Sequence, residues 1–525
     1  MSARTVVVVG AGPAGLSAAR AAARAGAEVT LLDASDQVGG QFWRHSARPA
    51  PDERRYHHGW GTFTALRDVV ATHPRVTVLT SAQVWALERL DDGVRLRVLV
   101  GPADAAGREH LTLTPDALVL ATGAHDRTLP FPGWQLPGVT TAGAAQALAK
   151  AERVAVGDRV VVAGAGPFLL PVATSLLRTG ARVLSVHEAA TPASLARGWG
   201  SRPAGLVGTA HKLGELAGYV GALARHGVAY RVGEAVVAAR GDGRVEEVTV
   251  ARVDARWSPV PGTERTVAAD AVCVSHCFTP RLELAVAAGC AISPDRFVVV
   301  DAAQRSTVPG VWAAGELTGI GGAEAALAEG WVAGHHAATG PGGPDPADGS
   351  DGADESDGAD ESDGADAGLA RAVRRRARSV DFARRLEAAH GIRGGWTAWL
   401  RDDTLVCRCE EVDAGTLRAA ACATGSTDLR SVRLTSRAGL GPCQARVCGR
   451  TVAELVGARD DAPGACGASP PATPDRRPLV VPVRLGDLAT LPDDPPPGAP
   501  QPGDPLPGGP DATSTRPEDP RVPSP

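Results

Sequence analysis

The fold is decided by Val6-Val-Val-Val-Gly10-Ala-Gly12-Pro-Ala-Gly15. This stretch fits the pattern G-x-G-x-x-G between an apolar run typical of a buried strand and an Ala-rich run, Leu16–Ala25, typical of a helix. Gly10 permits a tight turn, Gly12 lets the backbone approach a pyrophosphate, and Gly15 allows the helix to pack closely on the strand. We therefore expect a dinucleotide-binding unit at the start of the chain.

The residues that follow this turn complete the predicted site. Pro13 and Ala14 complete the expected contacts of the turn, and the free N–H groups and partial positive charge of the helix N-terminus favour a phosphate. Asp33 follows the next expected strand, Glu28–Leu32, at the place where an acidic side chain can bond a ribose hydroxyl. A tight turn without a ligand is the alternative, which is disfavoured because strand, helix and acid are all present.

Three further segments narrow the expected dinucleotide to FAD. Gly39-Gly40-Gln41 lies just past Asp33, Leu118–Gly123 is a buried strand ending in Ala-Thr-Gly, and Thr307–Glu316 is another ending in Gly-Glu. With these segments the chain resembles the flavoproteins that have two dinucleotide-binding domains, the class of glutathione reductase and ferredoxin reductases.

That resemblance implies that the Gly-acid pair holds the ribityl chain, with Glu316 where the class has Asp. It also implies that the helix starting near Gly322 directs its N-terminus at the flavin pyrimidine ring. The FAD-contacting residues expected outside the first turn are Asp33, Gly40, Gln41, Ala121, Thr122, Gly123, Gly315, Glu316, Gly322 and Ala323.

The glycine pattern returns about one domain later as Gly164-Ala-Gly166-Pro-Phe-Leu169. Leu169 stands where the third glycine belongs, and His187, with Glu188 beside it, aligns with Asp33. Three interpretations of this second unit stay open: an NAD(P)H site, a site for another adenine nucleotide, or a structural unit without a ligand. Its candidate cofactor-binding residues are Gly164 and Gly166.

Side chains next to the expected flavin are a further set of candidates. His125 and Asp126 follow the Ala-Thr-Gly turn, and Gln41, Phe42 and Trp43 could line the flavin face. A structural role is the alternative for each of them, since a histidine with satisfied hydrogen bonds is common.

Two close cysteine pairs lie in the C-terminal part, as Cys407-Arg-Cys409 and Cys443-Gln-Ala-Arg-Val-Cys448. Four thiolates suit a [2Fe–2S] cluster, because that cluster takes four cysteine ligands. Zinc is the alternative, but it prefers spacers of two to four residues. The predicted ligands are Cys407, Cys409, Cys443 and Cys448. Cys422 and Cys466 lie outside this pattern and are expected not to be ligands. Cys273 and Cys277 are expected to be buried structural residues, with a dithiol catalyst as the disfavoured alternative.

Alternating strands and helices predict an α/β fold, with two Rossmann-like, glutathione-reductase-type nucleotide-binding domains and a small C-terminal α-rich [2Fe–2S] module. Residues 76–115 alternate apolar and polar side chains, which predicts an antiparallel excursion. The expected divisions are an FAD-binding domain (1–135 and 270–340), a second NAD(P)-like domain (140–269), an acidic disordered insert (341–368), a helical linker (369–399), the [2Fe–2S] domain (400–456) and a Pro-rich flexible tail (457–525). Within the tail, residues 479–488 have enough apolar content to dock on the body.

Composition limits the possible functions. The chain has 525 residues, 44% of them hydrophobic, and a net charge of −5, so a nucleic-acid partner bound by bulk charge is not expected. The sequence contains no apolar run of about eighteen residues, and no signal peptide is expected because the strand at Val6–Val9 leads directly into the first glycine turn. A cytoplasmic location follows, with the membrane periphery as an option within a complex. In that reducing setting nine cysteines indicate metal or redox roles.

The module resembles bacterioferritin-associated-ferredoxin-like domains, with a wider final spacer. A more specific resemblance is carried by Val406–Val412, Arg437–Cys448, Ala121–Arg127, Pro130–Gly138 and Gly319–Gly330. These segments resemble the family of opine oxidase A subunits, hydrogen cyanide synthase B subunits, and the α subunits of dye-linked L-proline and D-hydroxyproline dehydrogenases.

The resemblance implies a heteromeric amine or imino-acid dehydrogenase, whose substrate is oxidised in a separate flavoprotein subunit of the D-amino-acid-oxidase type. The present chain would relay electrons through FAD and the cluster, and a small [2Fe–2S] ferredoxin-like subunit would be a further partner. No paired carboxylates or nucleophile–base constellation is found, so no catalytic residue is assigned. A stand-alone NAD(P)H-dependent ferredoxin-type reductase is the alternative, and an iron-handling protein is a third, which the complete FAD site disfavours.

Overall fold

The computed structural model describes residues 3–48, 50–103, 105–200, 210–340, 365–425, 429–457, 477 and 479–491. The disorder predicted for the acidic insert therefore concerns residues 341–364, which lie outside the described residues, as does most of the tail. The predicted end of that insert at 368 is wrong, because helix α10 (Ala365–His390) already begins at Ala365. Leu369 and Ala372 near the start of this helix pack on Val332.

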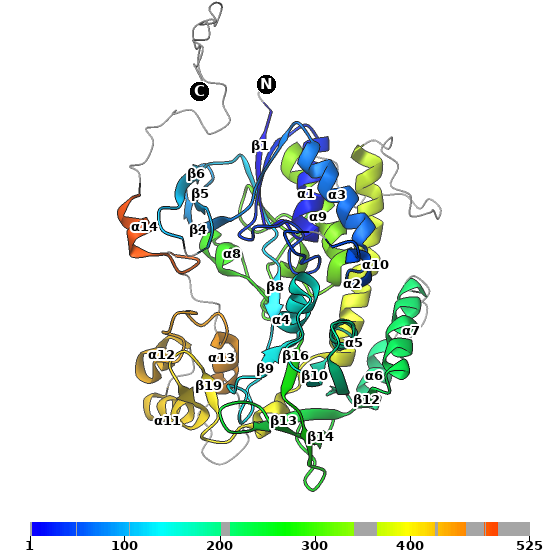
Figure 1. Cartoon of the computed structure of the whole chain (residues 1–525). Helices are drawn as coiled ribbons and strands as arrows, with labels where there is room; N and C mark the ends of the chain where they lie inside the picture. Colours follow the sequence, from blue (N-terminus) through cyan, green and yellow to red (C-terminus); the bar gives the residue numbers. More distant parts are fainter. Residues whose placement is uncertain are drawn as a thin grey trace, which may run out of the picture.

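A five-stranded parallel sheet forms the first unit, which occupies the upper part of Figure 1, and its strand order is β18-β7-β1-β2-β3. One face is covered by helices and the other by an antiparallel sheet, so both faces of the strands are buried and their sequences are almost wholly apolar. The parallel strands are β1 (Thr5–Val9), β2 (Glu28–Leu32), β3 (Val76–Leu79), β7 (Ala117–Leu120) and β18 (Val311–Ala313). The covering elements are α1 (Pro13–Arg24), α3 (Trp60–Thr72) and α9 (Gly322–Thr339) on one side, and β4 (Ala82–Arg89), β5 (Val94–Val100) and β6 (Glu109–Leu113) on the other.

Helices α1 and α9 meet backbone to backbone. A Cβ atom on Gly330 would lie 2.1 Å from the Ala14 carbonyl oxygen, and one on Gly334 would lie 2.1 Å from that of Ala18. The Ser17 hydroxyl also donates a hydrogen bond of 2.7 Å to the carbonyl of Leu327 on α9. This close contact fixes the start of α9 beside the first glycine turn.

The second unit repeats the same arrangement, with a parallel sheet in the order β12-β11-β10-β16-β9. Its strands are β9 (Val139–Thr141), β10 (Arg159–Ala165), β11 (Arg182–Glu188), β12 (Ala229–Val232) and β16 (Ala271–His276), with helices α4 (Ala142–Ala147), α5 (Leu169–Arg178), α6 (Pro192–Gly200) and α7 (Ala210–Arg225), and an antiparallel sheet of β13 (Glu234–Arg240), β14 (Glu247–Arg252) and β15 (Arg265–Ala268). The two units are joined by the antiparallel pair β8 (Ala124–Asp126) and β17 (Phe278–Pro280).

The predicted antiparallel excursion begins later than expected. Val76–Leu79 pairs in parallel with β2 and belongs to the main sheet. An edge strand is covered on fewer sides than a central one, so its sequence alternates like that of an antiparallel strand. The excursion itself comprises β4, β5 and β6, and it has a counterpart in β13, β14 and β15 of the second unit.

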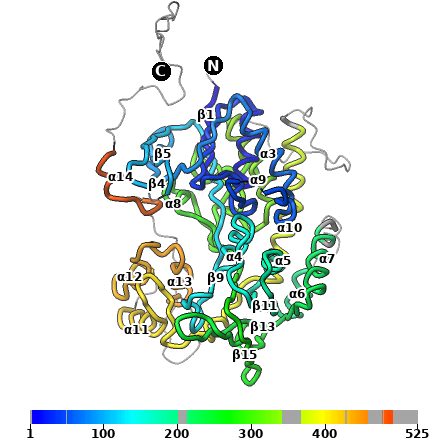
Figure 2. Tube along the Cα trace, viewed as in Figure 1, coloured from blue at the N-terminus to red at the C-terminus, as the bar shows by residue number. Residues whose placement is uncertain are grey.

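Helix α10 leads from the first unit to the cysteine module. It packs along α9 and reaches α6 at its C-terminal end (Figure 2). A short 3₁₀ helix, Gly394–Trp399, then enters the module, which consists of β19 (Leu405–Cys407), β20 (Val412–Asp413), α11 (Ala414–Thr424), α12 (Leu429–Ser436) and α13 (Gly449–Gly457). The module shares one hydrophobic core with the second unit, in which the Trp257 and Trp399 rings stack with centroids 6.4 Å apart.

Residues 479–491, here called the strap, return to the first unit. They include α14 (Leu485–Ala489) and pack apolar side chains on Trp85, Ala86 and Leu99 of the β4–β5–β6 sheet. The prediction that 479–488 docks on the body because of its apolar content is therefore confirmed, and this stretch is an exception to the predicted flexible tail. The strap also carries a buried ion pair, in which Arg108 donates a 2.8 Å hydrogen bond to Asp487, both side chains being 4% exposed.

Replacing Asp487 with Ala is expected to release the strap. The change leaves the Arg108 charge buried without its partner, which costs about 3 kcal/mol. Hydrogen exchange of the strap amides should therefore rise about 100-fold when followed by mass spectrometry. The matched control is Asp402→Ala, which breaks the exposed pair with Arg418 and should change exchange less than about threefold; equal effects of the two variants would contradict this role of Asp487.

Candidate cofactor site

Four segments proposed from the sequence meet at the first glycine turn. A Cβ atom on Gly10 would lie 2.3 Å from the Ala121 carbonyl oxygen, and one on Gly40 would lie 2.8 Å from the Gly12 Cα. A Cβ atom on Gly315 would similarly lie 2.9 Å from the Cβ atom of Ala14. The turn, the Gly39-Gly40 segment, the Ala-Thr-Gly turn and the Gly-Glu pair therefore form one backbone cradle at the carboxyl end of the first sheet.

The cradle leaves room for a ligand. At Gly12 the nearest atom to a built Cβ is 3.9 Å away, and at Gly123 and Gly322 nothing lies within 4 Å. Gly15 is the contrary case, since its Cβ would lie 1.7 Å from the Gly10 carbonyl oxygen. Gly15 therefore serves helix packing, while Gly12 faces the space in which a pyrophosphate would approach. Ala323 lies in the first turn of α9, and Gln41 is exposed.

Asp33 holds the turn in place. Its carboxylate accepts hydrogen bonds from the backbone N–H groups of Ala11 at 2.6 Å and Ser35 at 2.8 Å. Each carboxylate oxygen has further lone pairs, so this geometry still permits a ribose hydroxyl to donate to it.

Three acidic side chains interact at the Gly-Glu pair: Glu316 of the pair itself, Asp126 and Glu329. Burial, with smaller contributions from Asp126 and Glu329, raises the pKa of Glu316 to about 7. Glu316 has no hydrogen-bond partner among the described residues, which leaves it available for the hydroxyls of a ribityl chain. Glu329 instead holds the pair in position, accepting from the Gly315 N–H at 2.8 Å and the Thr318 hydroxyl at 2.7 Å. No pattern in the sequence singles out Glu329, although it lies in the quoted Gly319–Gly330 segment.

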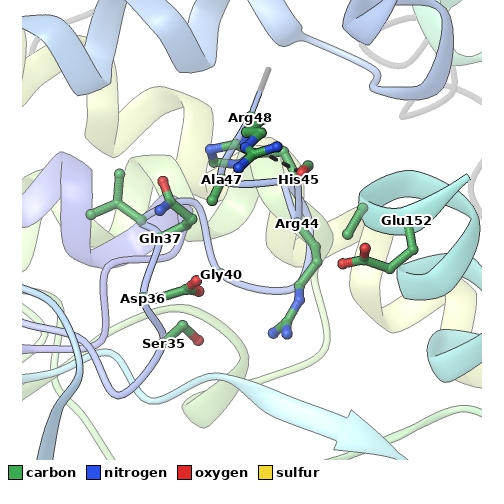
Figure 3. Close-up of a pocket in the computed structure, with 12 residues that line it drawn as sticks. Ser35, Asp36, Gln37, Gly40, Arg44, His45, Ala47, Arg48 and Glu152 are labelled. Carbon is green, nitrogen blue, oxygen red and sulfur yellow. Dashed lines mark hydrogen bonds between the residues drawn. The ribbon is translucent and has the colours of Figure 1, made fainter. Parts of the chain in front are cut away.

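The residues after Gly40 form one wall of a cavity of about 330 Å³ (Figure 3). Arg44 and Glu152 approach from facing elements, with Ser35 and Asp36 on one side and His45 and Arg48 on another. Arg44 places a positive charge in a cavity that Gly40 also lines, next to the dinucleotide turn. Arg44 was not predicted from the sequence, where its only signal is its proximity to Gly40.

Trp43 has the structural role that was weighed against a place on the flavin face. Trp43 is buried and stacks on Phe63 with centroids 5.1 Å apart, so it belongs to the core of the first unit. Phe42 is partly buried, and its carbonyl accepts a 3.0 Å hydrogen bond from the buried Lys150. Burial lowers the pKa of Lys150 to about 8.

The acid of the second glycine turn is Glu188. A bulge in β11 beside Val160 and Val161 adds one residue, so Glu188 and not His187 pairs with Gly164. Glu188 accepts from the N–H groups of Gly166 and Ala190, each at 2.9 Å, in the way that Asp33 does in the first unit. The prediction that His187 aligns with Asp33 is therefore wrong, because Glu188 occupies that position.

His187 has a structural role of its own. It lies 2.8 Å from the Ser185 hydroxyl and 2.9 Å from a carboxylate oxygen of Glu234. Burial lowers its pKa to about 4, which keeps the ring neutral at ordinary pH.

The four predicted cluster ligands come together in the module. The Cys448 thiol makes hydrogen-bonding contacts with the sulfurs of Cys407 and Cys443, and Cys443 also contacts Cys409. Contact with Cys448 lowers the pKa values of Cys407 and Cys443, while the same contacts raise the pKa of Cys448 and burial raises that of Cys409. The lowered values favour thiolates at Cys407 and Cys443, and the thiolate is the form that binds a metal. The Gly439 N–H donates to the Cys407 sulfur at 3.3 Å, as expected for a loop that stabilises a negatively charged cluster.

The remaining cysteines do not join this group. Cys422 lies on α11, and Cys466 lies outside the described residues. Cys273 is fully buried in β16, and burial raises its pKa, as it raises that of Cys277 to about 11. Neither thiol is poised to ionise, which agrees with a structural role.

The cysteine loop contacts the first unit directly. The His125 Nε2 atom, on β8 just after the Ala-Thr-Gly turn, lies 3.2 Å from the carbonyl oxygen of Arg446, between Cys443 and Cys448. Arg446 is also within 3.2 Å of the Glu283 carboxylate. The expected flavin site and the four sulfurs thus approach each other through one short contact.

Two family models match the chain. Residues 4–330 match the model described as pyridine nucleotide-disulphide oxidoreductase, and residues 405–458 match the BFD-like [2Fe-2S] binding domain. These matches support FAD and a [2Fe–2S] cluster as the cofactors, with which the cradle and the four sulfurs agree.

Similar proteins confirm the resemblance that the sequence motifs indicated. The A subunit of opine oxidase from Agrobacterium tumefaciens is 33% identical over 501 residues, which are 93% of this chain and 92% of that protein. Hydrogen cyanide synthase subunit HcnB of Pseudomonas aeruginosa is 32% identical over 452 residues, or 84% of this chain and 90% of that protein. The solved L-proline dehydrogenase from P. horikoshii shares the fold, with a TM-score of 0.59 at 17% identity over 92% of this chain and 79% of that one.

Replacing Gly12 with Val is expected to prevent FAD binding without unfolding the protein. The backbone at Gly12 is compatible with any residue, and its Cβ has space, but the added side chain would fill the approach of the pyrophosphate. We expect FAD affinity, measured by flavin fluorescence, to fall at least about 100-fold, or about 3 kcal/mol. Gly61→Val, at an exposed glycine of α3, is the control and should bind FAD normally; wild-type affinity in Gly12→Val would contradict the assignment of the cradle.

Proposed function

Because the chain belongs to the pyridine nucleotide-disulphide oxidoreductase family and carries a BFD-like [2Fe-2S] binding domain, we propose that it is the electron-transfer subunit of an amine or imino-acid dehydrogenase complex. The contact between His125 and the Arg446 carbonyl carries this proposal, since it joins the two cofactor sites. FAD would take electrons in pairs, and a [2Fe–2S] cluster would take them singly.

The residues of this chain bind and orient the two groups. The proposed FAD contacts are the N–H groups around Gly12, the Asp33 carboxylate at the ribose, and Glu316 at the ribityl chain. The N-terminus of α9 at Gly322 and Ala323 adds a partial positive charge beside the flavin, which favours its reduced, anionic form. Cys407, Cys409, Cys443 and Cys448 are the proposed cluster ligands.

The docking of the module supports a fixed relay. Arg127, buried in the first unit's connection to the second, forms an ion pair with Glu454 on α13, and the indole N–H of Trp134 donates a 2.6 Å hydrogen bond to the Leu405 carbonyl. These contacts flank the His125 contact on the same face of the module. They hold the cysteine loop against β8 without any further chain.

The partners follow from the relatives. Both relatives are named as subunits, one of opine oxidase and the other of hydrogen cyanide synthase, so a hetero-oligomer is the supported assembly. We propose a D-amino-acid-oxidase-like flavoprotein as the subunit that oxidises an opine, proline, hydroxyproline or glycine-type substrate. The next partner proposed is a small [2Fe–2S] ferredoxin-like subunit. Among the described residues, none of the helices combines the length and apolar character that crossing a bilayer requires.

Replacing Cys443 with Ser is expected to remove the cluster and leave FAD in place. Iron and acid-labile sulfide should fall to background, because a cluster needs all four thiolates, whereas the flavin absorbance should persist because the cradle lies in a different unit. Cys290→Ala, at a buried cysteine away from the module, is the control and should keep both groups. Zinc in place of iron, or loss of flavin together with the cluster, would contradict the proposed arrangement.

Co-purification tests the proposed complex. A tagged copy of the full chain, isolated from its native cells, should bring down a D-amino-acid-oxidase-like chain in a fixed ratio. An amine or imino acid should then bleach the flavin of the complex but not that of the isolated chain. A chain that remains alone and is reduced by NADH or NADPH would instead be the stand-alone reductase.

A further inference from the structure

The two glycine turns of this chain are an internal comparison. In each, a carboxylate at the end of the second strand accepts hydrogen bonds from the turn and from the residue two positions after itself. In dinucleotide-binding units this carboxylate also receives a ribose hydroxyl. The two carboxylates differ in what surrounds them: Asp33 is 8% exposed and Glu188 is 0% exposed.

Two side chains cover Glu188. The Tyr230 hydroxyl on β12 donates a 3.3 Å hydrogen bond to its carboxylate, and the Nδ1 atom of His390 lies 3.3 Å from the same oxygen. The indole N–H of Trp199 donates to the Nε2 atom of His390 at 3.3 Å. His390 therefore lies between the indole of Trp199 and the carboxylate of Glu188.

The helix that supplies His390 is firmly seated. A Cβ atom on Gly198 would lie 2.4 Å from the Ala389 nitrogen, so the ends of α6 and α10 touch backbone to backbone. Arg385, buried on α10, donates to the Trp199 carbonyl at 3.1 Å and pairs with Asp381 at 2.8 Å. A ribose hydroxyl could reach Glu188 only if the contact between α6 and α10 opened.

The phosphate side of the same turn is open but has a different backbone. Gly166 has a positive φ of 103°, whereas its counterpart Gly12 has a φ of −75°, and nothing lies within 4 Å of a Cβ atom built on Gly166. The second unit therefore keeps open space at its glycine turn, while its ribose position is filled by the chain itself.

We infer that His390 and Tyr230 determine the electron-donor specificity of this chain, because they close the ribose position of the second unit and so exclude NADH and NADPH. The inference rests on the proposed function, in which a partner subunit and not a nicotinamide nucleotide reduces the flavin. The closure itself depends only on the contacts of Glu188. Of the three interpretations of the second unit, it selects the structural one.

Equilibrium dialysis of the full, cofactor-loaded protein against NADH or NADPH tests the exclusion. At about 1 mM nucleotide the wild type should retain less than about 0.1 equivalent, which corresponds to a Kd weaker than about 10 mM. His390→Ala/Tyr230→Phe should bind at least about tenfold more tightly. The gain should disappear when Gly166→Ala is added and persist when Gly12→Val is added, which assigns it to the second turn and not to the FAD site.

His226→Ala, at an exposed histidine before β12 in the same unit, is the matched control and should show no gain. One equivalent bound to the wild type and lost in Gly166→Ala would overturn the inference, as would a folded double variant that gains nothing. If the double variant does not fold, hydrogen exchange of residues 385–391 in the wild type decides the matter: unchanged exchange with NADH supports closure, and faster exchange refutes it. Neither readout requires the flavin or the cluster to work, so failure of the proposed function would be seen separately.

Discussion

In both nucleotide-type units, a carboxylate at the end of the second parallel strand holds the glycine turn through backbone N–H groups. Asp33 does so for Ala11, and Glu188 does so for Gly166. The bond fixes the turn against the neighbouring strand and therefore the direction of the helix that follows. Everything placed around the first turn, including the Ala-Thr-Gly segment, the Gly-Glu pair and the start of α9, depends on that fixed geometry. Both units thus use a carboxylate to hold the glycine turn, but Asp33 is more exposed than Glu188.

The elements with strong local signals could be predicted from the sequence. The strand Glu28–Leu32 has the expected bounds, and α1 differs from the expected Leu16–Ala25 by only a few residues, because alternating burial and glycine turns act over short distances. The four cysteines that come together in the module were also recognisable, since close cysteine pairs have few other uses. The identity of the second acid was not, because a single bulge in β11 shifts the register by one residue and no residue type marks a bulge in that strand.

The sequence did not predict which segments far apart in the chain lie next to each other in the fold. Arg371–Arg378 resembles an ordinary charged helix face, and nothing in it indicates that the same helix ends beside Glu188. Trp43 resembled a flavin-lining aromatic because it follows Gly40, but Phe63 on α3 offers it a better partner in the core. These outcomes depend on which surfaces the finished fold brings together, and that information is spread over residues far apart in the chain.

The module is attached at both of its ends. α10 and Gly394–Trp399 bring the chain in along the second unit, and the strap takes it back to the first, where the Val480 N–H donates to the Trp85 carbonyl at 2.8 Å and the Val480 carbonyl accepts from Arg446. A domain tethered on one side only would have to swing into place before each exchange, as mobile carrier domains do. Here the spacing between the two cofactor sites is set once, when the chain folds. Electron exchange inside this protein should accordingly be insensitive to the viscosity of the medium, and the only diffusive steps left are those of its partners.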